Sequence, residues 1–298
     1  MAPWIFPICW GLVVAGPQGW VDPCEEPGAP ASFTGHDAFG EVLQAHVERG
    51  SVGGIETTLV NYQSLRESPS ELRGYLRQLC NVSLDSLSKA EAAALYCNAY
   101  NALMIAIVVH FAPADSVRQL DSLMPSGSIF REPLGTVGRL KVSLDDMEHS
   151  YVRGALAKDL GVQGRIHSCF VCASLSCPDM QMVPFEAASF VEQLTTATRA
   201  WLANPTKNPG PDSGGKLILS KIFFWYGPDF IAAEGSRQSF VQKYSSWQVP
   251  NDQQIAFIDY NWALNAVNGT GSYSGAATGG PSLLLAAVLA LIVACTRM

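Results

Sequence analysis

The most prominent hydrophobic pattern in the chain is a long apolar segment near its middle. Residues 90–111 (AEAAALYCNAYNALMIAIVVHF) are apolar nearly all round a helix, which predicts a buried helix at the centre of a domain. Asn98 and Asn101 interrupt the segment, and their spacing of three residues places both on one face. A buried amide must find hydrogen-bond partners. The two side chains therefore either tie the helix to neighbouring backbone or line a site.

Segments with the period of an amphipathic helix lie on both sides of this central one. They occupy residues 36–50, 68–79, 143–160 and 187–203. The third has defined boundaries, because Ser143 followed by Asp146 resembles a capping box. Gly161 is a natural stop after its end. These segments predict four further helices.

Shorter apolar runs predict the strands. Residues 165–172 (RIHSCFVC) indicate a buried strand, and the small residues at 173–178 the turn that leaves it. Another strand is expected at 216–220, after a loop rich in proline and glycine. Side chains alternate between the two faces of a strand. His167 is therefore expected to point away from Cys172.

The N-terminal end of the chain differs from the middle. Residues 4–16 (WIFPICWGLVVAG) form an apolar stretch that is too short to span a bilayer. Such a stretch at the start of a chain is typical of a signal peptide, which we expect over residues 1–19. A buried N-terminal strand is the alternative interpretation.

The C-terminal end carries a different signal. Residues 266–282 are small and polar, and residues 283–298 form a hydrophobic tail. This order is typical of a GPI-anchor signal, with the lipid attached at Asn268 or Ser274. The tail is shorter than the roughly 17–25 residues of a transmembrane helix, and a short tail-anchor helix is the alternative. One globular domain is expected over residues 36–265.

The composition agrees with an exported, folded domain. Of the 298 residues 48% are hydrophobic and 15% charged, which gives ample material for a core. The net charge of -7 and the lack of clustered Lys and Arg argue against a nucleic-acid partner. Asn81 and Asn268 each begin a glycosylation sequon, which indicates passage through the secretory pathway.

The cysteines give information on the cellular compartment of the protein and on its possible catalytic residues. The chain has eight, of which Cys9 and Cys295 lie in the terminal segments. The others are Cys24, Cys80, Cys97, Cys169, Cys172 and Cys177. In an oxidising compartment most of these should pair. Their spacing does not suggest a metal site, and no phosphate-binding loop opens a helix, so no cofactor is expected.

Cys172 is the candidate for chemistry. A cysteine at the end of a strand, before a turn of small residues and with histidines elsewhere in the chain, is the outline of a thiol nucleophile. The other interpretation is a packed core residue or half of a disulfide. His149 lies on a separate predicted helix and is free to meet Cys172 across the fold.

Four motifs follow one another in a fixed order. They are YCNAYNAL (96–103), SLDDMEH (143–149) with Arg153 after it, RIHSCFVCASLSCP (165–178) and LSKIFFWYGPDF (219–230). With IDYNWALN (258–265) they resemble the domain of unknown function 547 family over residues 38–265. The resemblance implies an α+β single domain related to papain-like cysteine peptidases and transglutaminases. Its central buried helix would pack on an antiparallel sheet.

The resemblance also implies roles for individual residues. Cys172 matches the family's cysteine and His149 its histidine, which implies a catalytic pair in which an imidazolium stabilises the thiolate. Asn98 and Glu148 are expected to orient the imidazole or to stabilise an oxyanion. The residues expected to bind substrate are Asn101, Ser174 and His167.

Four positions qualify this correspondence. Cys177 matches a position that is often not cysteine in plant members, so it is not expected to be the nucleophile. Tyr96 and Cys97 stand where the family usually has Trp and an apolar residue. Val171, beside Cys172, stands where bacterial members often carry Asn.

Two functions from different classes follow. The first is a cell-surface thiol enzyme of acyl transfer, by amide hydrolysis or transglutaminase-like exchange, acting on an extracellular peptide, protein or small amide. The second is an extracellular binding or adhesion module in which Cys172 is locked in a disulfide with Cys169 or Cys177. In both, the membrane is a partner through the lipid anchor at the outer face of the plasma membrane.

The anchor is open to a direct test. Phosphatidylinositol-specific phospholipase C should release the protein from intact cells, because a lipid attached after removal of the tail is its only hold on the membrane. The released fraction is measured in the supernatant. A chain that stays on the cells and still contains residues 283–298 contradicts the expectation.

Overall fold

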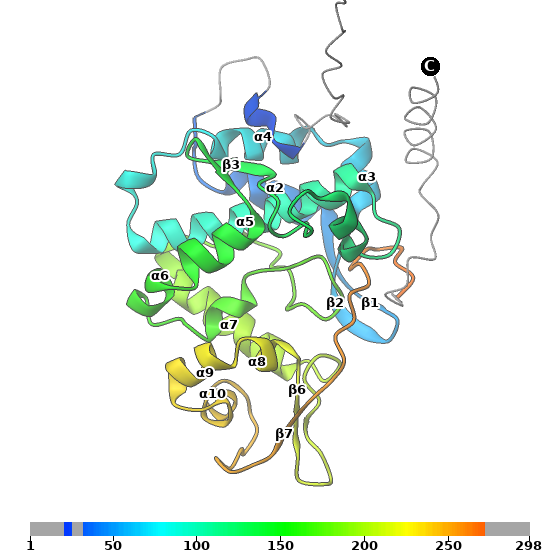
Figure 1. Cartoon of the computed structure of the whole chain (residues 1–298), viewed down its shortest axis with the longest axis vertical. Helices are drawn as coiled ribbons and strands as arrows, with labels where there is room; N and C mark the ends of the chain where they lie inside the picture. Colours follow the sequence, from blue (N-terminus) through cyan, green and yellow to red (C-terminus); the bar gives the residue numbers. More distant parts are fainter. Residues whose placement is uncertain (1–20, 26–31, 272–298) are drawn as a thin grey trace, which may run out of the picture.

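The computed structural model describes residues 21–25 and 32–271 (Figure 1). The expected signal peptide at 1–19, the anchor site at Ser274 and the tail at 283–298 lie outside these residues. Asn268 is exposed and Asn81 half-buried, and their glycosylation stays a prediction.

Helix α5 (Lys89–Phe111) lies at the centre of the main core, as the apolar segment predicts (Figure 1). Its start is fixed by a capping box, in which the Ser88 hydroxyl accepts from the Glu91 N–H and the Glu91 carboxylate accepts from the Ser88 N–H. It is the one helix of the described residues that is long and apolar enough to cross a membrane, and 94% of that window is buried inside the protein. It is therefore a core helix.

Other helices surround α5. Those in contact with it are α3 (Tyr62–Glu67), α4 (Ser70–Leu79), η4 (Asp146–Val152), α6 (Ala155–Asp159), η6 (Ala187–Ser189) and α7 (Phe190–Ala203). The remaining helices are η1 (Pro23–Glu25), α2 (Asp37–His46), η2 (Leu84–Ser86), η3 (Val117–Leu123), η5 (Arg165–Ser168), α8 (Ile222–Trp225), α9 (Gly227–Glu234) and α10 (Arg237–Tyr244). Helices α8, α9 and α10 pack with α7 around a second apolar cluster at the lower end of Figure 1.

The strands of the described residues form three small sheets. Two are antiparallel hairpins, β1 (Val47–Val52) with β2 (Ile55–Val60) and β3 (Gly135–Val137) with β4 (Leu140–Val142). In the third, β6 (Leu217–Leu219) pairs antiparallel with β5 (Gly210–Pro211) and parallel with β7 (Ile255–Phe257). The α+β single-domain class is confirmed, but the one antiparallel sheet expected under the central helix is instead divided among these three.

Two of the predicted helices differ from the prediction: one ends early and the other is divided in two. The segment 36–50 is helical only to His46, because Val47 begins the pairing of β1 with β2. The segment 143–160 divides into η4, a π-helix in which the Arg153 N–H donates to the Glu148 carbonyl, and α6. Its boundaries are as predicted: the Ser143 hydroxyl accepts from the Asp146 N–H, and Gly161 has a φ of 63°.

The buried strand predicted at 165–172 is wrong. Residues Arg165–Ser168 form the 3-10 helix η5, and irregular backbone follows. The hydrogen bonds of this backbone are made with a side chain and not with a neighbouring strand. The Asn101 amide donates to the Cys169 carbonyl at 2.8 Å and accepts from the Val171 N–H at 3.0 Å. The alternation of faces expected for Cys172 and His167 therefore does not apply.

Asn98 acts in the same way one turn earlier. Its amide donates to the Phe185 carbonyl at 2.8 Å and accepts from the Phe185 N–H at 2.9 Å. Asn98 and Asn101 are both buried. Of the two interpretations open from the sequence, the structure supports the first: both amides tie the central helix to neighbouring backbone.

Two disulfides hold the described part of the chain together. Cys24 pairs with Cys80, which attaches residues 21–25 to the end of α4. Cys97 pairs with Cys169, which attaches α5 to the segment after η5. The pairing of Cys169 excludes the Cys169–Cys172 disulfide considered from the sequence.

Replacing Asn101 with Ala tests the bridge from α5. The variant leaves the Cys169 carbonyl and the Val171 N–H buried without a partner, so the free energy of unfolding should fall by about 2–4 kcal/mol. Chemical denaturation measures the loss. Gln44→Ala, at an exposed position on α2, is the control and should change stability by less than about 0.5 kcal/mol. Equal stability of the two variants would contradict the structural role.

Candidate functional site

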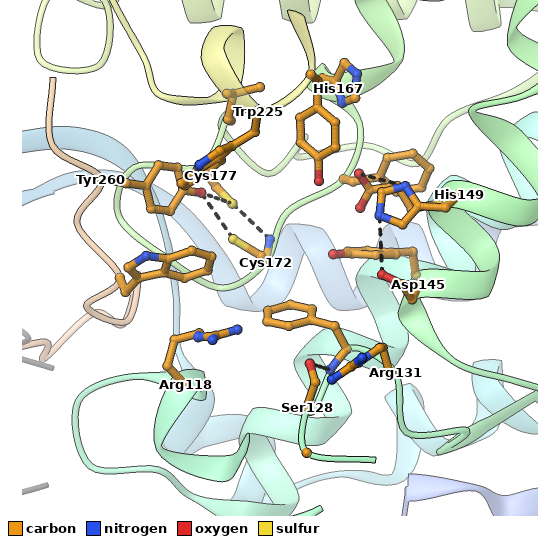
Figure 2. A pocket seen from close by; sticks show the side chains of 18 residues that line it. Arg118, Ser128, Arg131, Asp145, His149, His167, Cys172, Cys177, Trp225 and Tyr260 are labelled. Atoms are coloured by element: carbon orange, nitrogen blue, oxygen red, sulfur yellow. Dashed lines mark hydrogen bonds and ion pairs between the residues drawn. The ribbon is translucent and has the colours of Figure 1, made fainter. Parts of the chain in front are cut away.

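A cavity of about 440 Å³ opens between the main core and the α8–α9 end of the domain (Figure 2). It is lined by Tyr100, Arg118, Gly127, Ser128, Phe130, Arg131, Asp145, Glu148, His149, His167, Phe170, Cys172, Cys177, Ile222, Trp225, Tyr226, Tyr260 and Trp262. The motifs that the sequence singled out around 149, 172, 226 and 260 thus meet at one place.

One side of the cavity carries two free cysteines. Cys172 is half-buried and Cys177 is buried. The backbone N–H of Cys172 donates to the Cys177 sulfur at 3.0 Å. The Tyr260 hydroxyl lies 3.3 Å from the Cys172 sulfur and 3.1 Å from the Cys177 sulfur, as Figure 2 shows. Ser174 completes the cluster, its hydroxyl 3.1 Å from the Cys172 sulfur.

These contacts shift the pKa values of the two thiols in opposite directions. Burial raises the pKa of Cys177, but hydrogen bonds from Cys172, Tyr260 and Ser174 outweigh it and lower that pKa to about 6. Burial and the charge on Cys177 raise the pKa of Cys172 well above its ordinary value. The two shifts have opposite directions, so Cys177 loses its proton more readily than Cys172 does.

A buried lysine lies directly behind Cys177. The Lys207 ammonium donates to the Cys177 carbonyl at 2.5 Å, the Asp179 carboxylate at 2.6 Å and the Thr57 hydroxyl at 2.7 Å. Three acceptors match the three N–H donors of an ammonium group. Its side chain is 1% exposed, so its charge is screened little by water. Lys207 thus fixes the loop after Cys177 and places a positive charge beside the thiols.

Glu148, from η4, contributes a carboxyl group to the same cavity. Burial raises its pKa to about 7; Asp145 and Cys177 add to the shift, while Tyr226 and Arg153 oppose it. A carboxyl group with a pKa near neutrality is present in both protonation states at pH 7. It is thus able to give and to take a proton.

His149 lines the cavity with Cys172, but the two do not pair. Its Nδ1 lies 3.0 Å from Arg153 Nη1, and its Nε2 lies 3.3 Å from an Asp145 oxygen. Arginine has only donors, so Nδ1 accepts and Nε2 carries the proton. Burial lowers the pKa of His149, and Arg153 adds to that effect. The imidazolium expected to stabilise the Cys172 thiolate is therefore not what lowers a thiol pKa here.

His167 belongs to the cavity wall as well, although the strand on which its orientation away from Cys172 was predicted does not form. Its Nε2 lies 2.8 Å from Asp229, whose carboxylate also accepts from Arg153 Nε at 2.5 Å. The His167 ring stacks on Tyr226 with centroids 4.2 Å apart. Burial lowers the pKa of His167. These contacts make it a neutral ring that holds the wall in place.

Several residues of the site were not singled out from the sequence, and four of them hold the thiols, the histidines or Glu148. Tyr260, Asp229 and Tyr226 all lie inside quoted motifs, whose order along the chain was the only available signal. Lys207 lies in the loop 204–215 and carries no local signal at all. Asn98 and Asn101, expected at the site, do not line the cavity; Asn101 supports the backbone beside Cys172.

Among the described residues one cluster has the spacing of a metal site, but its ligand atoms already have other partners. Asp22, Cys24 and Cys80 place their ligand atoms close together. Both sulfurs, however, belong to the Cys24–Cys80 disulfide. The Asp22 carboxylate accepts from Lys141 and Thr136. This cluster is a structural attachment of the N-terminal residues.

Comparison with known proteins supports the resemblance found in the motifs. The model of the family described as "Protein of unknown function, DUF547" matches residues 84–202. That span contains α5, η4 and both free cysteines. No curated protein and no solved structure gives a significant match.

The charge of Lys207 predicts shifts of opposite sign in two variants. Lys207→Met removes a positive charge beside the thiol pair, so the Cys177 pKa should rise from about 6. Asp179→Asn removes a negative charge next to Lys207, so that pKa should fall. Thiolate ultraviolet absorbance as a function of pH measures both.

Thr57→Val is the matched control, because it removes one contact of Lys207 and leaves its charge. Its midpoint should stay near that of the unmodified protein. A purely structural role for Lys207 would lower thermal stability in all three variants and leave the three midpoints together.

Proposed function

We propose that the cavity is the active site of a thiol-dependent acyl-transfer enzyme that cleaves or exchanges amide bonds. The observation that carries the proposal is the cluster of two free thiols beside Glu148, of which Cys177 loses its proton more readily than Cys172. Because the other four cysteines of the described residues form two disulfides, a pair of thiols left free in a cavity is better suited to chemistry than to packing.

Cys172 is the nucleophile and Cys177 its base in this mechanism. Cys172 is the more exposed sulfur, and the Cys177 thiolate accepts a hydrogen bond from it. As the Cys172 sulfur attacks the amide carbon, its proton passes to Cys177 and a C–S bond forms. A base with a pKa of about 6 is mostly ionised at neutral pH and so is ready to accept that proton.

Glu148 completes the proton balance. When the C–N bond breaks, the leaving amine takes a proton from the protonated Glu148 carboxyl group. Water, or a second amine in an exchange reaction, then attacks the thioester and returns a proton to Glu148. Cys172 leaves as a thiolate and recovers its proton from Cys177. A pKa of about 7 lets Glu148 act in both steps.

The location proposed for this enzyme is the outer face of the plasma membrane. Two disulfides in the described residues support passage through an oxidising compartment. The apolar start at 1–19, the sequons and the tail at 283–298 support export and attachment by a GPI anchor.

The alternative is a binding or adhesion module in which Cys172 and Cys177 form a disulfide. A count of free thiols on the denatured, unreduced mature protein separates the two. The enzyme requires both thiols to be free, as they are in the structure. The binding module requires that neither thiol is free, because the two form a disulfide.

Replacing Cys177 with Ala tests its role as base. Acylation by para-nitrophenyl acetate, followed by mass analysis of the Cys172 peptide, should rise with pH through about 6 in the unmodified protein. In Cys177→Ala the rise should move to the ordinary thiol range near pH 8.5 or above, and the rate at pH 6.5 should fall by about tenfold or more.

Cys172→Ala is the matched control and should abolish acylation. If acylation of Cys172 follows the same pH profile with and without Cys177, then Cys177 is not the base and the proposed mechanism is wrong.

A further inference from the structure

The side of the cavity across from the thiols gathers two guanidinium groups. Figure 2 shows Arg118, Ser128 and Arg131 together there, with Cys172 and Cys177 on the other side. The mechanism proposed above uses none of these three residues. They form a separate subsite of the same cavity.

Arg118 is held in place by its surroundings. Its guanidinium carbon lies 5.2 Å from the Trp262 ring centroid and 6.0 Å from that of Phe130. Asp121 pairs with Nη2 at 2.9 Å and is itself fixed by the Ile129 N–H. Within the described residues, no protein partner occupies Nε or Nη1. A rigid guanidinium with free N–H donors facing a cavity is suited to bind an anion.

The neighbouring groups decide which anion fits. Arg131 also lines the cavity and donates through Nη2 to the Ser126 carbonyl at 3.1 Å, and among the described residues its Nε and Nη1 have no protein partner. Asp121 offsets one of the two guanidinium charges, and Asp145 and Glu148 line the same cavity, so the subsite offers a ligand at most one net positive charge. A singly charged carboxylate, which guanidinium groups bind in a fork of two hydrogen bonds, matches that charge better than a dianion does.

The walls between the subsite and the thiols are aromatic. The Tyr260 ring lies 4.6 Å from Trp262 and 4.9 Å from Trp225, centroid to centroid. Both tryptophans line the cavity. A ligand that reaches from the thiols to Arg118 therefore passes along flat apolar surfaces, which favours an apolar or aromatic body.

We propose that Arg118, with Arg131 beside it, binds a carboxylate of the substrate. The substrate class is then an amide that carries a free carboxylate on an apolar body, such as an N-acyl amino acid or the carboxy-terminal residue of a peptide. This inference rests on the proposed acyl-transfer function, because it names the substrate of the same site.

Two probes that differ only in the carboxylate test the inference. N-acetyltryptophan and N-acetyltryptophan amide are titrated into the mature protein, and binding is measured by calorimetry. The acid should bind about tenfold more tightly than the neutral amide, because a charge-assisted hydrogen bond contributes at least that much.

Variants then assign the preference to a residue. Arg118→Gln should bring the two probes to the same affinity, and Arg131→Gln should reduce the difference less. Arg199→Gln, at an exposed position on α7 outside this cavity, is the matched control and should keep the full preference. If Arg118→Gln does not fold, the comparison of the two probes on the unmodified protein still decides.

Equal affinity of the probes, or no binding of either, overturns the inference. A preference for the acid that survives Arg118→Gln overturns its assignment to Arg118. The titrations are repeated on Cys172→Ala, which cannot be acylated and so measures binding without turnover, and this failure is therefore distinct from failure of the proposed function. If the acid binds more tightly but Cys172 is not acylated, the proposed enzymatic function is contradicted and the carboxylate subsite is kept. If Cys172 is acylated but the acid has no preference, the proposed substrate class is contradicted and the enzymatic function is kept.

Discussion

The amide of Asn101 is the contact on which the arrangement of the thiols depends. It extends from the central helix and holds the backbone on both sides of Phe170, at the Cys169 carbonyl and the Val171 N–H. The Cys97–Cys169 disulfide connects the same two segments a few residues away. A segment with no strand partner thereby gains a fixed conformation, and Cys172 follows directly from it.

The free thiols are then placed by contacts from distant parts of the chain. Tyr260 reaches them from the C-terminal segment, which pairs with the loop after Cys172 through the bridge between Ser174 and Leu264. Lys207 reaches the Cys177 carbonyl from the other side. Burial alone would raise both thiol pKa values, and hydrogen bonds from Cys172, Tyr260 and Ser174 lower that of Cys177.

The site differs from a cysteine–histidine pair in how it manages protons. His149 is held by Arg153 and Asp145 and stays neutral, and His167 is held by Asp229. The groups that titrate near neutrality are Cys177, with a pKa of about 6, and Glu148, with a pKa of about 7. In the mechanism proposed here, a thiolate and a carboxyl group do the work that an imidazole does in papain-like enzymes.

The sequence by itself determined the central helix, its capping by local side chains and the residues around which the cavity forms. These are properties of short segments: a continuous apolar run, a Ser143–Asp146 cap and a glycine after a helix end have the same meaning in any context. The family motifs likewise pointed to Cys172, His149 and Glu148, all of which line the cavity.

Only the tertiary structure decided which of these residues interact. An apolar run such as 165–172 has the same composition whether its backbone pairs with a strand or with a side chain, and here Asn101 supplies the partner. The ionisation of Cys177 depends on donors from residues 172, 174 and 260, and Lys207 lies thirty positions further along the chain than the carbonyl it holds. Hydrogen bonds and charges act through distances in space, which the order of residues along the chain does not record.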